Sequence, residues 1–405
     1  MRLIPRRMVL LFAPLWGLTL LYSVGCSGRS RSAAAQGDRL NDLKIEARTL
    51  IGAGDHQGAV AILEALSREA PEDPQVLAML GESYAGLGRM DDAVGAYDRA
   101  VRLSYTDYRF HLGLARVLMT TGKTGRALTE FEIAAEYGAH DAVALYDYGL
   151  ALHAFGRERD ALAQWRRAFE LDGSDPRYAE AVAIGLYATG DPLAVQYFER
   201  ARELGARSAG FHNNYGQALE RAGRFTEAAS QLEEAVTLAP DTEAYRFNLA
   251  ALYMRSGRYQ AAIGVWDFLV SRFGPRWSYL VYRGRALLEL GRSGEAAASA
   301  GEAVAGFESG ALEREGRLDR TPPGLGEALE VLAMSYRGRG ELQKARGAIE
   351  RALALEPRNV SFLNNYGVIL AANGMIADAK AQWRKVLEID GENEAAKRNL
   401  SALER

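Results

Sequence analysis

The chain has 405 residues, of which 48% are hydrophobic and 25% charged, so it is long enough for two or three ordinary domains or for one extended array. Its 49 lysine and arginine residues nearly balance its 52 aspartate and glutamate residues, and no basic run stands out in the body of the chain. Nucleic acid is therefore not an expected partner, because neutralising phosphates requires a concentrated positive face.

Residues 1–25 have the layout of a signal peptide. Three arginines near the start precede an uncharged apolar stretch, MVLLFAPLWGLTLLYSV. The only cysteine of the protein, Cys26, follows directly in the sequence SVGC. This context resembles the bacterial lipobox, and the resemblance implies that Cys26 is lipidated and becomes the mature N-terminus.

Two alternatives to lipidation remain open. The apolar stretch is marginally long enough to be an uncleaved anchor in the inner membrane, or the signal is cleaved further along the chain. Each version exports the body of the protein. With Ser27 rather than an aspartate after the cysteine, the sorting rules of lipoproteins imply the outer membrane, facing the periplasm. We expect residues 26–39 to be a lipidated N-terminus and flexible tether, because SGRSRSAAAQG is small, polar and basic.

Ten glycines mark an internal repeat. Successive members of the set are separated by 34, 34, 34, 34, 33, 34, 34, 49 and 34 residues, and an alanine follows each glycine five residues later, or four in GDPLA. A period of 34 held over ten copies predicts a helical solenoid. The glycines are Gly54, Gly88, Gly122, Gly156, Gly190, Gly223, Gly257, Gly291, Gly340 and Gly374.

The stretch 142–175 shows why each copy is predicted to be a helical hairpin. Leu145, Tyr148 and Leu152 fall on one helical stripe, and Gly156 then supplies the left-handed conformation that ends a helix. A second stripe runs through Trp165 and its neighbouring small residues. Each hairpin has a face that it cannot bury alone, so the copies must stack.

This pattern resembles the tetratricopeptide repeat (TPR) family, most clearly in LAMLGESYAGLGRMDDAVGAYDRAV (77–101) and LNNYGVILAANGMIADAKAQWRKVL (363–387). The resemblance implies an all-α, right-handed α-solenoid of about ten hairpins. Repeats are expected to begin near 40, 74, 108, 142, 176, 209, 243, 277, 326 and 360. Repeats one to eight thus occupy 40–310 and repeats nine and ten occupy 326–393, and 394–405 is expected to form a polar-faced capping helix.

Fifteen extra residues (311–325) interrupt the period between the eighth and ninth repeats. Charged, heptad-like sequence before them suggests that the second helix of the eighth repeat is prolonged. Pro322, Pro323 and Gly324 are expected to end it. Such an insertion lies on one face of a solenoid and disturbs the stack little.

The sequence contains no recognisable catalytic or cofactor motif. Its five histidines form no HExxH or paired ligand spacing, no glycine-rich loop follows a strand, and no serine sits in a nucleophile elbow. The chain is therefore interpreted as non-enzymatic, with no cofactor, metal or small-molecule substrate. A lone cysteine also allows no disulfide and no cysteine-based metal site.

The remaining candidate site is the groove lined by the first helix of each hairpin. Asparagine suits an extended peptide because its amide both donates and accepts hydrogen bonds, and aromatic side chains supply apolar contact. We predict a protein-binding groove formed by Asn213, Asn214, Gln217, Phe247, Asn248, Tyr282, Arg285, Asn364 and Asn365.

A structural role for some of these asparagines remains an alternative. Asn214, Asn248 and Asn365 precede the large–small pair of their repeats, where such residues also tie adjacent helices together, so Asn213 and Asn364 are the sharper ligand candidates. The lysine–asparagine carboxylate clamp of some chaperone-binding TPR proteins is not matched, because Lys44 and Arg48 lack the second asparagine. The tryptophans that share one register on the second helices are interpreted as core residues: Trp165, Trp266 and Trp383.

The predicted function is a membrane-tethered scaffold that binds peptide segments or partner proteins in its groove. Lipoproteins of this build resemble pilotins and pilus-assembly factors, including those of the Tad system, and envelope or secretion scaffolds. A regulatory docking subunit of a peptidoglycan or polysaccharide enzyme is the alternative. Self-association through the segment 309–327 is a third possibility.

Overall fold

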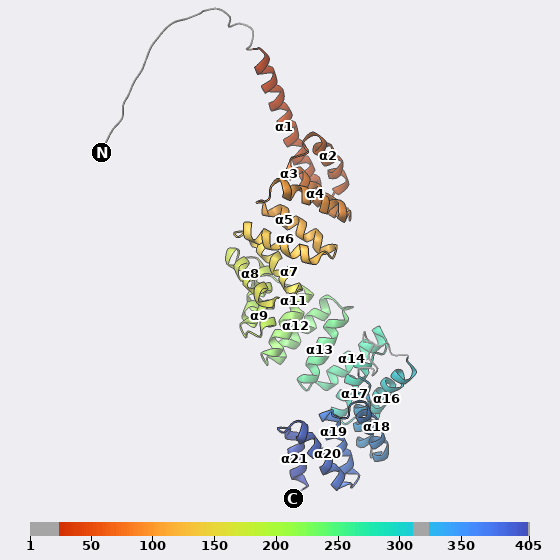
Figure 1. The fold of residues 1–405 in the computed structure, drawn as a ribbon. Coiled ribbons are helices and arrows are strands. Elements are labelled where there is room, and N and C mark those ends of the chain that lie inside the picture. The colour runs from red at the N-terminus through yellow and green to blue at the C-terminus, as the bar shows by residue number, and fades with distance from the viewer. Residues whose placement is uncertain (1–23, 311–323, 404–405) are drawn as a thin grey trace, which may run out of the picture. The chain divides into compact units, whose positions relative to one another are not determined.

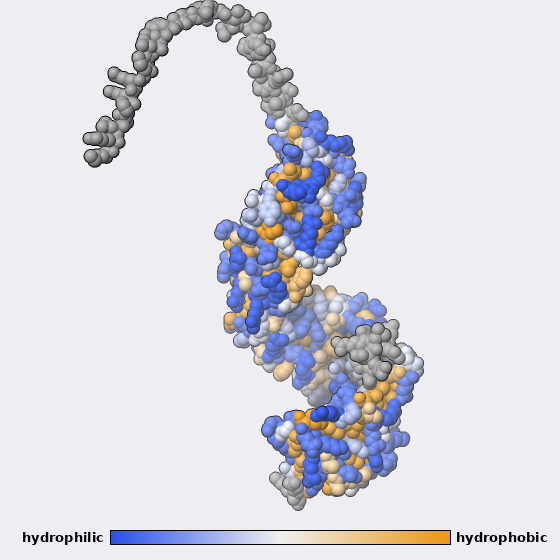
Figure 2. All heavy atoms as spheres, in the orientation of Figure 1, coloured by the Kyte–Doolittle hydropathy of each residue, from blue (hydrophilic) through white to orange (hydrophobic). Residues whose placement is uncertain are grey.

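The computed structural model describes residues 24–310 and 324–403 (Figure 1). Nearly all of the expected signal peptide (1–25) and of the insertion (311–325) therefore lies outside the described residues, as do the last two residues of the chain. The chain forms two compact units, residues 1–173 and 174–405, which are treated separately below. In the space-filling view, hydrophilic residues cover most of the visible face of each unit, with apolar patches between them (Figure 2).

Every regular element in the described residues is an α-helix. The N-terminal unit contains α1 (Val24–Gly52), α2 (His56–Glu69), α3 (Pro74–Gly86), α4 (Met90–Leu103), α5 (Tyr108–Thr120), α6 (Thr124–Tyr137), α7 (Ala142–Ala154) and α8 (Glu158–Leu171). The C-terminal unit contains α9 (Pro176–Thr189), α10 (Ala194–Leu204), α11 (Ala209–Arg221), α12 (Phe225–Leu238), α13 (Glu243–Arg255), α14 (Tyr259–Phe273), α15 (Trp277–Glu289), α16 (Ser293–Ser309), α17 (Leu325–Gly338), α18 (Leu342–Leu355), α19 (Val360–Ala372), α20 (Ile376–Ile389) and α21 (Glu394–Ala402).

This arrangement confirms the predicted all-α array of repeated hairpins. An odd-numbered helix packs against the following even-numbered one in each repeat, and α21 packs on α20 at the end of the array. The first helices begin within one residue of the positions expected from the second repeat onward.

Local sequence signals fix both ends of the first helices. Asp107 and Asp141 accept hydrogen bonds from backbone N–H groups of the first turn, which otherwise have no partner. The ten glycines that mark the period all have a φ of 72–79°, a left-handed conformation that glycine adopts at low cost. The repeated glycine is thus the turn between the two helices of a hairpin.

Within a hairpin, a small residue on the first helix lets a large side chain of the second helix approach. A Cβ added at Gly149 would lie 2.5 Å from Cδ1 of Trp165, and one added at Gly216 would lie 2.8 Å from Cγ of Leu232. Trp165, Trp266 and Trp383 are at most 3% exposed, which confirms their predicted core role.

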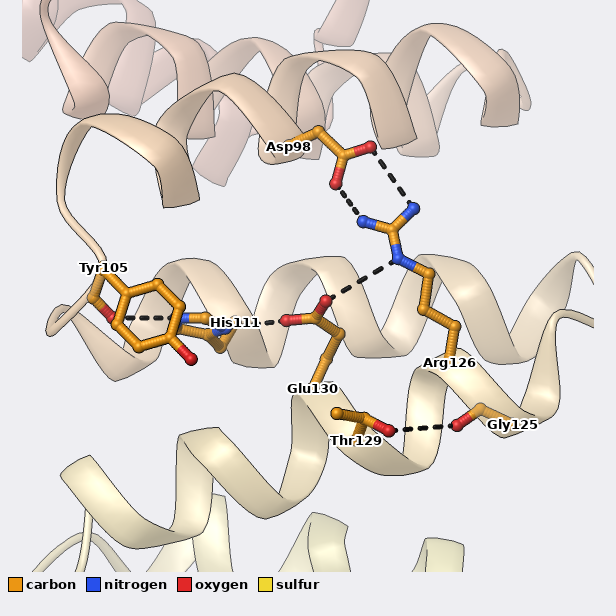
Figure 3. Close-up of polar contacts among 7 residues, drawn as sticks. All are labelled: Asp98, Tyr105, His111, Gly125, Arg126, Thr129 and Glu130. Carbon is orange, nitrogen blue, oxygen red and sulfur yellow. Dashed lines mark hydrogen bonds and ion pairs between the residues drawn. The ribbon is translucent and has the colours of Figure 1, made fainter.

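A polar network joins the second and third repeats of the N-terminal unit (Figure 3). Arg126 on α6 forms an ion pair with Asp98 on α4 and lies 3.7 Å from Glu130, whose carboxylate is 2.7 Å from Nδ1 of His111 on α5. The other ring nitrogen of His111 is 2.8 Å from the carbonyl oxygen of Tyr105, in the connection between α4 and α5. Three helices and the connection between α4 and α5 are thus held together by a chain of hydrogen bonds and ion pairs.

Within the repeats, three of the described helices depart from the common length of 13–15 residues. The prediction of a flexible tether at 26–39 is wrong, because α1 begins at Val24 and continues without a break into the first repeat. Three consecutive alanines and Gln36 in this stretch favour a helix. In the eighth repeat, α16 is prolonged to 17 residues, as expected, but it ends at Ser309 with Gly310 in a left-handed conformation, before the segment 322–324 that was expected to end it. In the fifth repeat, α10 has only 11 residues after the shortened turn.

Among the described residues, none of the helices combines the length and the apolar composition needed to span a bilayer.

Candidate functional site

The first helices line the inner face of each unit. Within the C-terminal unit, first helices of consecutive repeats contact one another, as α15 does with α17 and α17 with α19, whereas the second helices are further apart. The inner face is therefore made from side chains of several repeats at once.

A pocket of about 690 Å³ opens on this inner face in the last four repeats. Residues of α13, α15, α17 and α19 line it, together with the first turns of α14 and α16. The structure brings two residues of the predicted groove, Arg285 and Asn365, into this one pocket. The full lining is Met254, Tyr259, Arg285, Leu288, Glu289, Ser293, Glu330, Val331, Met334, Arg337, Gly338, Ser361 and Asn365.

Glu330 organises one wall of the pocket, and the sequence analysis did not select it. Glu330 is only 7% exposed. Its carboxylate accepts hydrogen bonds from Asn365 at 2.8 Å and from the hydroxyl of Ser361. Arg285 donates to the other oxygen at 3.3 Å and also pairs with Glu327 at 3.0 Å. A buried carboxylate requires such partners, so this wall is fixed across three repeats.

The remainder of the pocket is apolar at its base and charged at one end. Met254, Leu288 and Met334 come from α13, α15 and α17 and are each half-buried. Glu289 and Arg337 lie at the last turns of α15 and α17. The pocket thus presents flexible aliphatic side chains beside charged groups.

The predicted asparagines mainly bond to each other along the stack. Asn248 donates to the side-chain oxygen of Asn213 at 2.7 Å, and Asn399 of the capping helix donates to that of Asn364 at 3.1 Å. Asn365 repeats this geometry toward Glu330. In all three pairs the donor lies 35 residues after the acceptor, so each bond links one first helix to the next.

Asn213, one of the two sharper ligand candidates, is buried, and its amide is already hydrogen-bonded to neighbouring asparagines. Asn213 is only 7% exposed, because the following first helix covers its position, and its own amide donates to Asn214 at 3.2 Å. The structural alternative fits Asn248 and Asn365, which tie adjacent helices. Asn214, Gln217 and Asn364 are half-buried and do not line the pocket.

Phe247 and Tyr282 form an aromatic cluster with Trp266 between α13, α14 and α15. The rings of Phe247 and Tyr282 are 6.0 Å apart, and the Trp266 indole stacks on Tyr282 at 5.6 Å. Among the described residues, the indole N–H of Trp266 finds no hydrogen-bond partner, whereas those of Trp165 and Trp383 donate to backbone carbonyls of their first helices. The cluster lies beside the pocket and contributes no residue to its lining.

Two histidines of the described residues lie 2.7 Å from a carboxylate, exposed His153 from Glu158 and buried His111 from Glu130. Both ring nitrogens of His111 face oxygen atoms, and the residue is fully buried. No nitrogen is therefore free to act on a nucleophile or substrate. The part of the chain that the structure describes also holds no group of three or more histidine, cysteine, aspartate or glutamate residues placed to bind a metal.

The first repeat does not present a carboxylate clamp. Lys44 forms an ion pair with Asp73, so its ammonium is already neutralised. Burial by itself raises the pKa of the Asp73 carboxyl, but hydrogen bonds from Lys44 and from two backbone N–H groups outweigh it, and the pKa lies below its ordinary value.

The chain belongs to the Tetratricopeptide repeat family, whose profile matches residues 46–107, 112–176, 187–242, 247–313 and 331–400. Proteins of this family generally act as protein-interaction scaffolds that bind protein or peptide partners.

Individual relatives are more distant. The chain is 20% identical over 347 residues to the BBSome complex member BBS4 of Bos taurus, which covers 85% of this chain and 57% of that one. It is 32% identical over 141 residues to the cytochrome c-type biogenesis protein CycH of Bradyrhizobium diazoefficiens. This alignment covers 34% of the present chain and 38% of CycH. The chain spans between 22% and 57% of the length of the curated relatives it matches.

Among solved structures, Pseudomonas aeruginosa PilF aligns with a TM-score of 0.46 and 18% identity, over 52% of this chain and 97% of that one. This similarity concerns the fold alone.

Proposed function

We propose that the protein is a non-catalytic scaffold of the cell envelope that holds a segment of a partner protein in the pocket of its last four repeats. The observation that supports this is the pocket itself, about 690 Å³ on the inner face, lined by four consecutive first helices. A concave site with aliphatic side chains and a few fixed polar groups is the usual form of a binding site.

The proposed location is the outer membrane, facing the periplasm, with Cys26 lipidated. The support is the sequence: a positive start, an apolar stretch and then the only cysteine. An uncleaved helix in the inner membrane is the alternative. Both place the repeats outside the cytoplasm, where a scaffold assists assembly of a pilus, secretion or envelope complex.

A second candidate function is control of a peptidoglycan or polysaccharide enzyme by docking on it. The same pocket serves this role, since a scaffold and a regulatory subunit both bind a protein segment. The identity of the partner separates the two, because an assembly scaffold captures structural subunits and a regulator captures an enzyme.

A photo-crosslinking amino acid placed at position 334 in cells tests the proposal. Met334 lines the pocket, so we expect a covalent adduct with one protein, identified by mass spectrometry. The matched control is position 384, which is exposed on the second helix α20. Equal adducts at both positions, or none at 334, would contradict binding in the pocket.

A further inference from the structure

The pocket of the last four repeats contains an arginine without a partner. Arg337 lies in the last turn of α17 and is half-buried at the pocket wall. In the part of the chain that the structure describes, no ion pair or hydrogen bond engages its guanidinium. Arg285 in the same pocket differs, because Glu327 and Glu330 neutralise it.

The charge balance at this end of the pocket favours an incoming anion. A half-buried guanidinium is less well hydrated than an exposed one and interacts more strongly with an opposite charge. Glu289 is a competing acid on the lining, but it is exposed and forms no ion pair with Arg337 among the described residues. Water screens its carboxylate. The other acid, Glu330, is occupied by three donors.

The base of the pocket favours an aliphatic side chain. Met254, Leu288 and Met334 contribute half-buried apolar side chains to the lining. Methionine adapts its shape to an apolar guest. Burying a leucine or methionine side chain here removes apolar surface of both partners from water.

We propose that this pocket binds an extended segment of a partner protein in which one residue separates a leucine or methionine from an acidic residue. The aliphatic side chain lies among Met254, Leu288 and Met334, and the carboxylate pairs with Arg337. Met334 and Arg337 lie three residues apart on one face of α17, and residues i and i+2 of an extended chain also point to one side, about 7 Å apart. This inference rests on the proposed function and adds the chemistry of the partner.

Fluorescence anisotropy with three labelled peptides tests the inference on the full chain: GSDSLSDSG, GSKSLSKSG and GSDSASDSG. The first has an acidic residue two positions to each side of a leucine, the second replaces both acids by lysine, and the third replaces leucine by alanine. We expect saturable binding of the first and about tenfold weaker binding of each of the others, equivalent to about 1.4 kcal/mol. Equal affinities, or no saturable binding up to about 1 mM, would overturn the inference.

Variants of the chain identify the arginine responsible. Arg337→Gln is expected to weaken the affinity for the first peptide about tenfold, which corresponds to the loss of one charge-assisted hydrogen bond. Arg337→Glu is expected to reverse the preference, so that the lysine peptide binds more tightly. Glu289→Gln removes the competing acid and is expected to tighten the first peptide about twofold. The matched control is Arg384→Gln, at an exposed arginine of α20 outside the pocket. An effect of Arg384→Gln equal to that of Arg337→Gln would contradict the assignment.

Two outcomes separate this inference from the proposed function. If residue 334 crosslinks a partner in cells but the acidic peptide binds no better than the lysine peptide, the groove is a binding site and its proposed chemistry is wrong. If sedimentation velocity shows a dimer that Met334→Lys dissociates, the occupant is a second copy of the chain, and the inference is also overturned. A melting curve of each variant verifies that it remains folded.

Discussion

Replacement of Gly149 by alanine is expected to destabilise the fourth repeat, although alanine is the better helix former. The added Cβ would lie 2.5 Å from Cδ1 of Trp165 and closer still to Nε1, whereas carbon atoms in contact are normally separated by about 3.5–4.0 Å. The indole must therefore move by about 1 Å. Its N–H now donates to the carbonyl of Tyr146 at 3.2 Å, and this shift breaks that bond.

The magnitude follows from three contributions. A buried donor left without an acceptor costs about 1–3 kcal/mol, and overpacking costs about 1–3 kcal/mol. The higher helix propensity of alanine relative to glycine stabilises the helix by about 1 kcal/mol. The net loss is about 1–5 kcal/mol. The seventh repeat illustrates the mechanism, because Ala250 occupies the same register there and the indole N–H of Trp266 has no partner.

Hydrogen exchange is the appropriate assay, since repeats open locally and a single global unfolding energy is not well defined for an array. We expect faster exchange in α7 and α8 of Gly149→Ala. The control is Gly95→Ala in α4, where an added Cβ meets no atom within 4 Å, and this change is expected to stabilise by about 0.5–1 kcal/mol. The reasoning is refuted if both variants stabilise the chain to the same extent.

Four further predictions concern other contacts. Asn248→Ala removes the donor to buried Asn213 and is expected to cost about 1–2 kcal/mol, measured by hydrogen exchange in α11 and α13, whereas Asn214→Ala is expected to change stability by less than about 0.5 kcal/mol. Glu330→Gln is expected to destabilise the contact of α17 with α15 and α19 by about 1–3 kcal/mol in the same assay, and an unchanged exchange pattern would argue against its organising role. The hydrogen bond from Arg109 holds the pKa of Asp107 below its ordinary value. The stabilisation from this carboxylate is therefore present above about pH 4 and is lost as the pH falls through the lowered pKa. The melting temperature of Asp107→Asn is expected to decline less in acid than that of the original chain. Cys26→Ala is expected to abolish metabolic palmitate labelling, and labelling that persists would exclude lipidation at this residue.

Much of the fold was predictable because each turn repeats the same chemistry. The period of 34 located the first helices, since a glycine with positive φ is required at every hairpin turn. The first helix was not predicted correctly. A composition rich in small and polar residues suggested a tether at 26–39, but its alanines extend the helix of the first repeat, and composition alone does not distinguish these outcomes.

The site was harder to predict because the sequence gives the register of a residue but not its neighbours. Arg285 and Asn365 were selected from their register, and the structure places both in one pocket. Glu330 occupies the same register in the ninth repeat as Asn213 in the sixth and Asn364 in the tenth. Aligning the ninth repeat after the insertion would have identified it as a further polar residue of that register.

The three bonds between first helices suggest a rule for which polar residues of the inner face remain available to a ligand. An acceptor on one first helix is already hydrogen-bonded when the next first helix carries an amide 35 residues later, as in Asn213 with Asn248 and Glu330 with Asn365. Such pairs fix the stacking of repeats and leave their polar atoms satisfied. Near the ends of the first helices the same offset pairs Glu220 with Arg255, but the residue 35 positions after Arg337 is Ala372, which offers no polar side chain. A polar residue of the inner face is therefore available to a partner segment where the residue 35 positions later is apolar, as it is for Arg337.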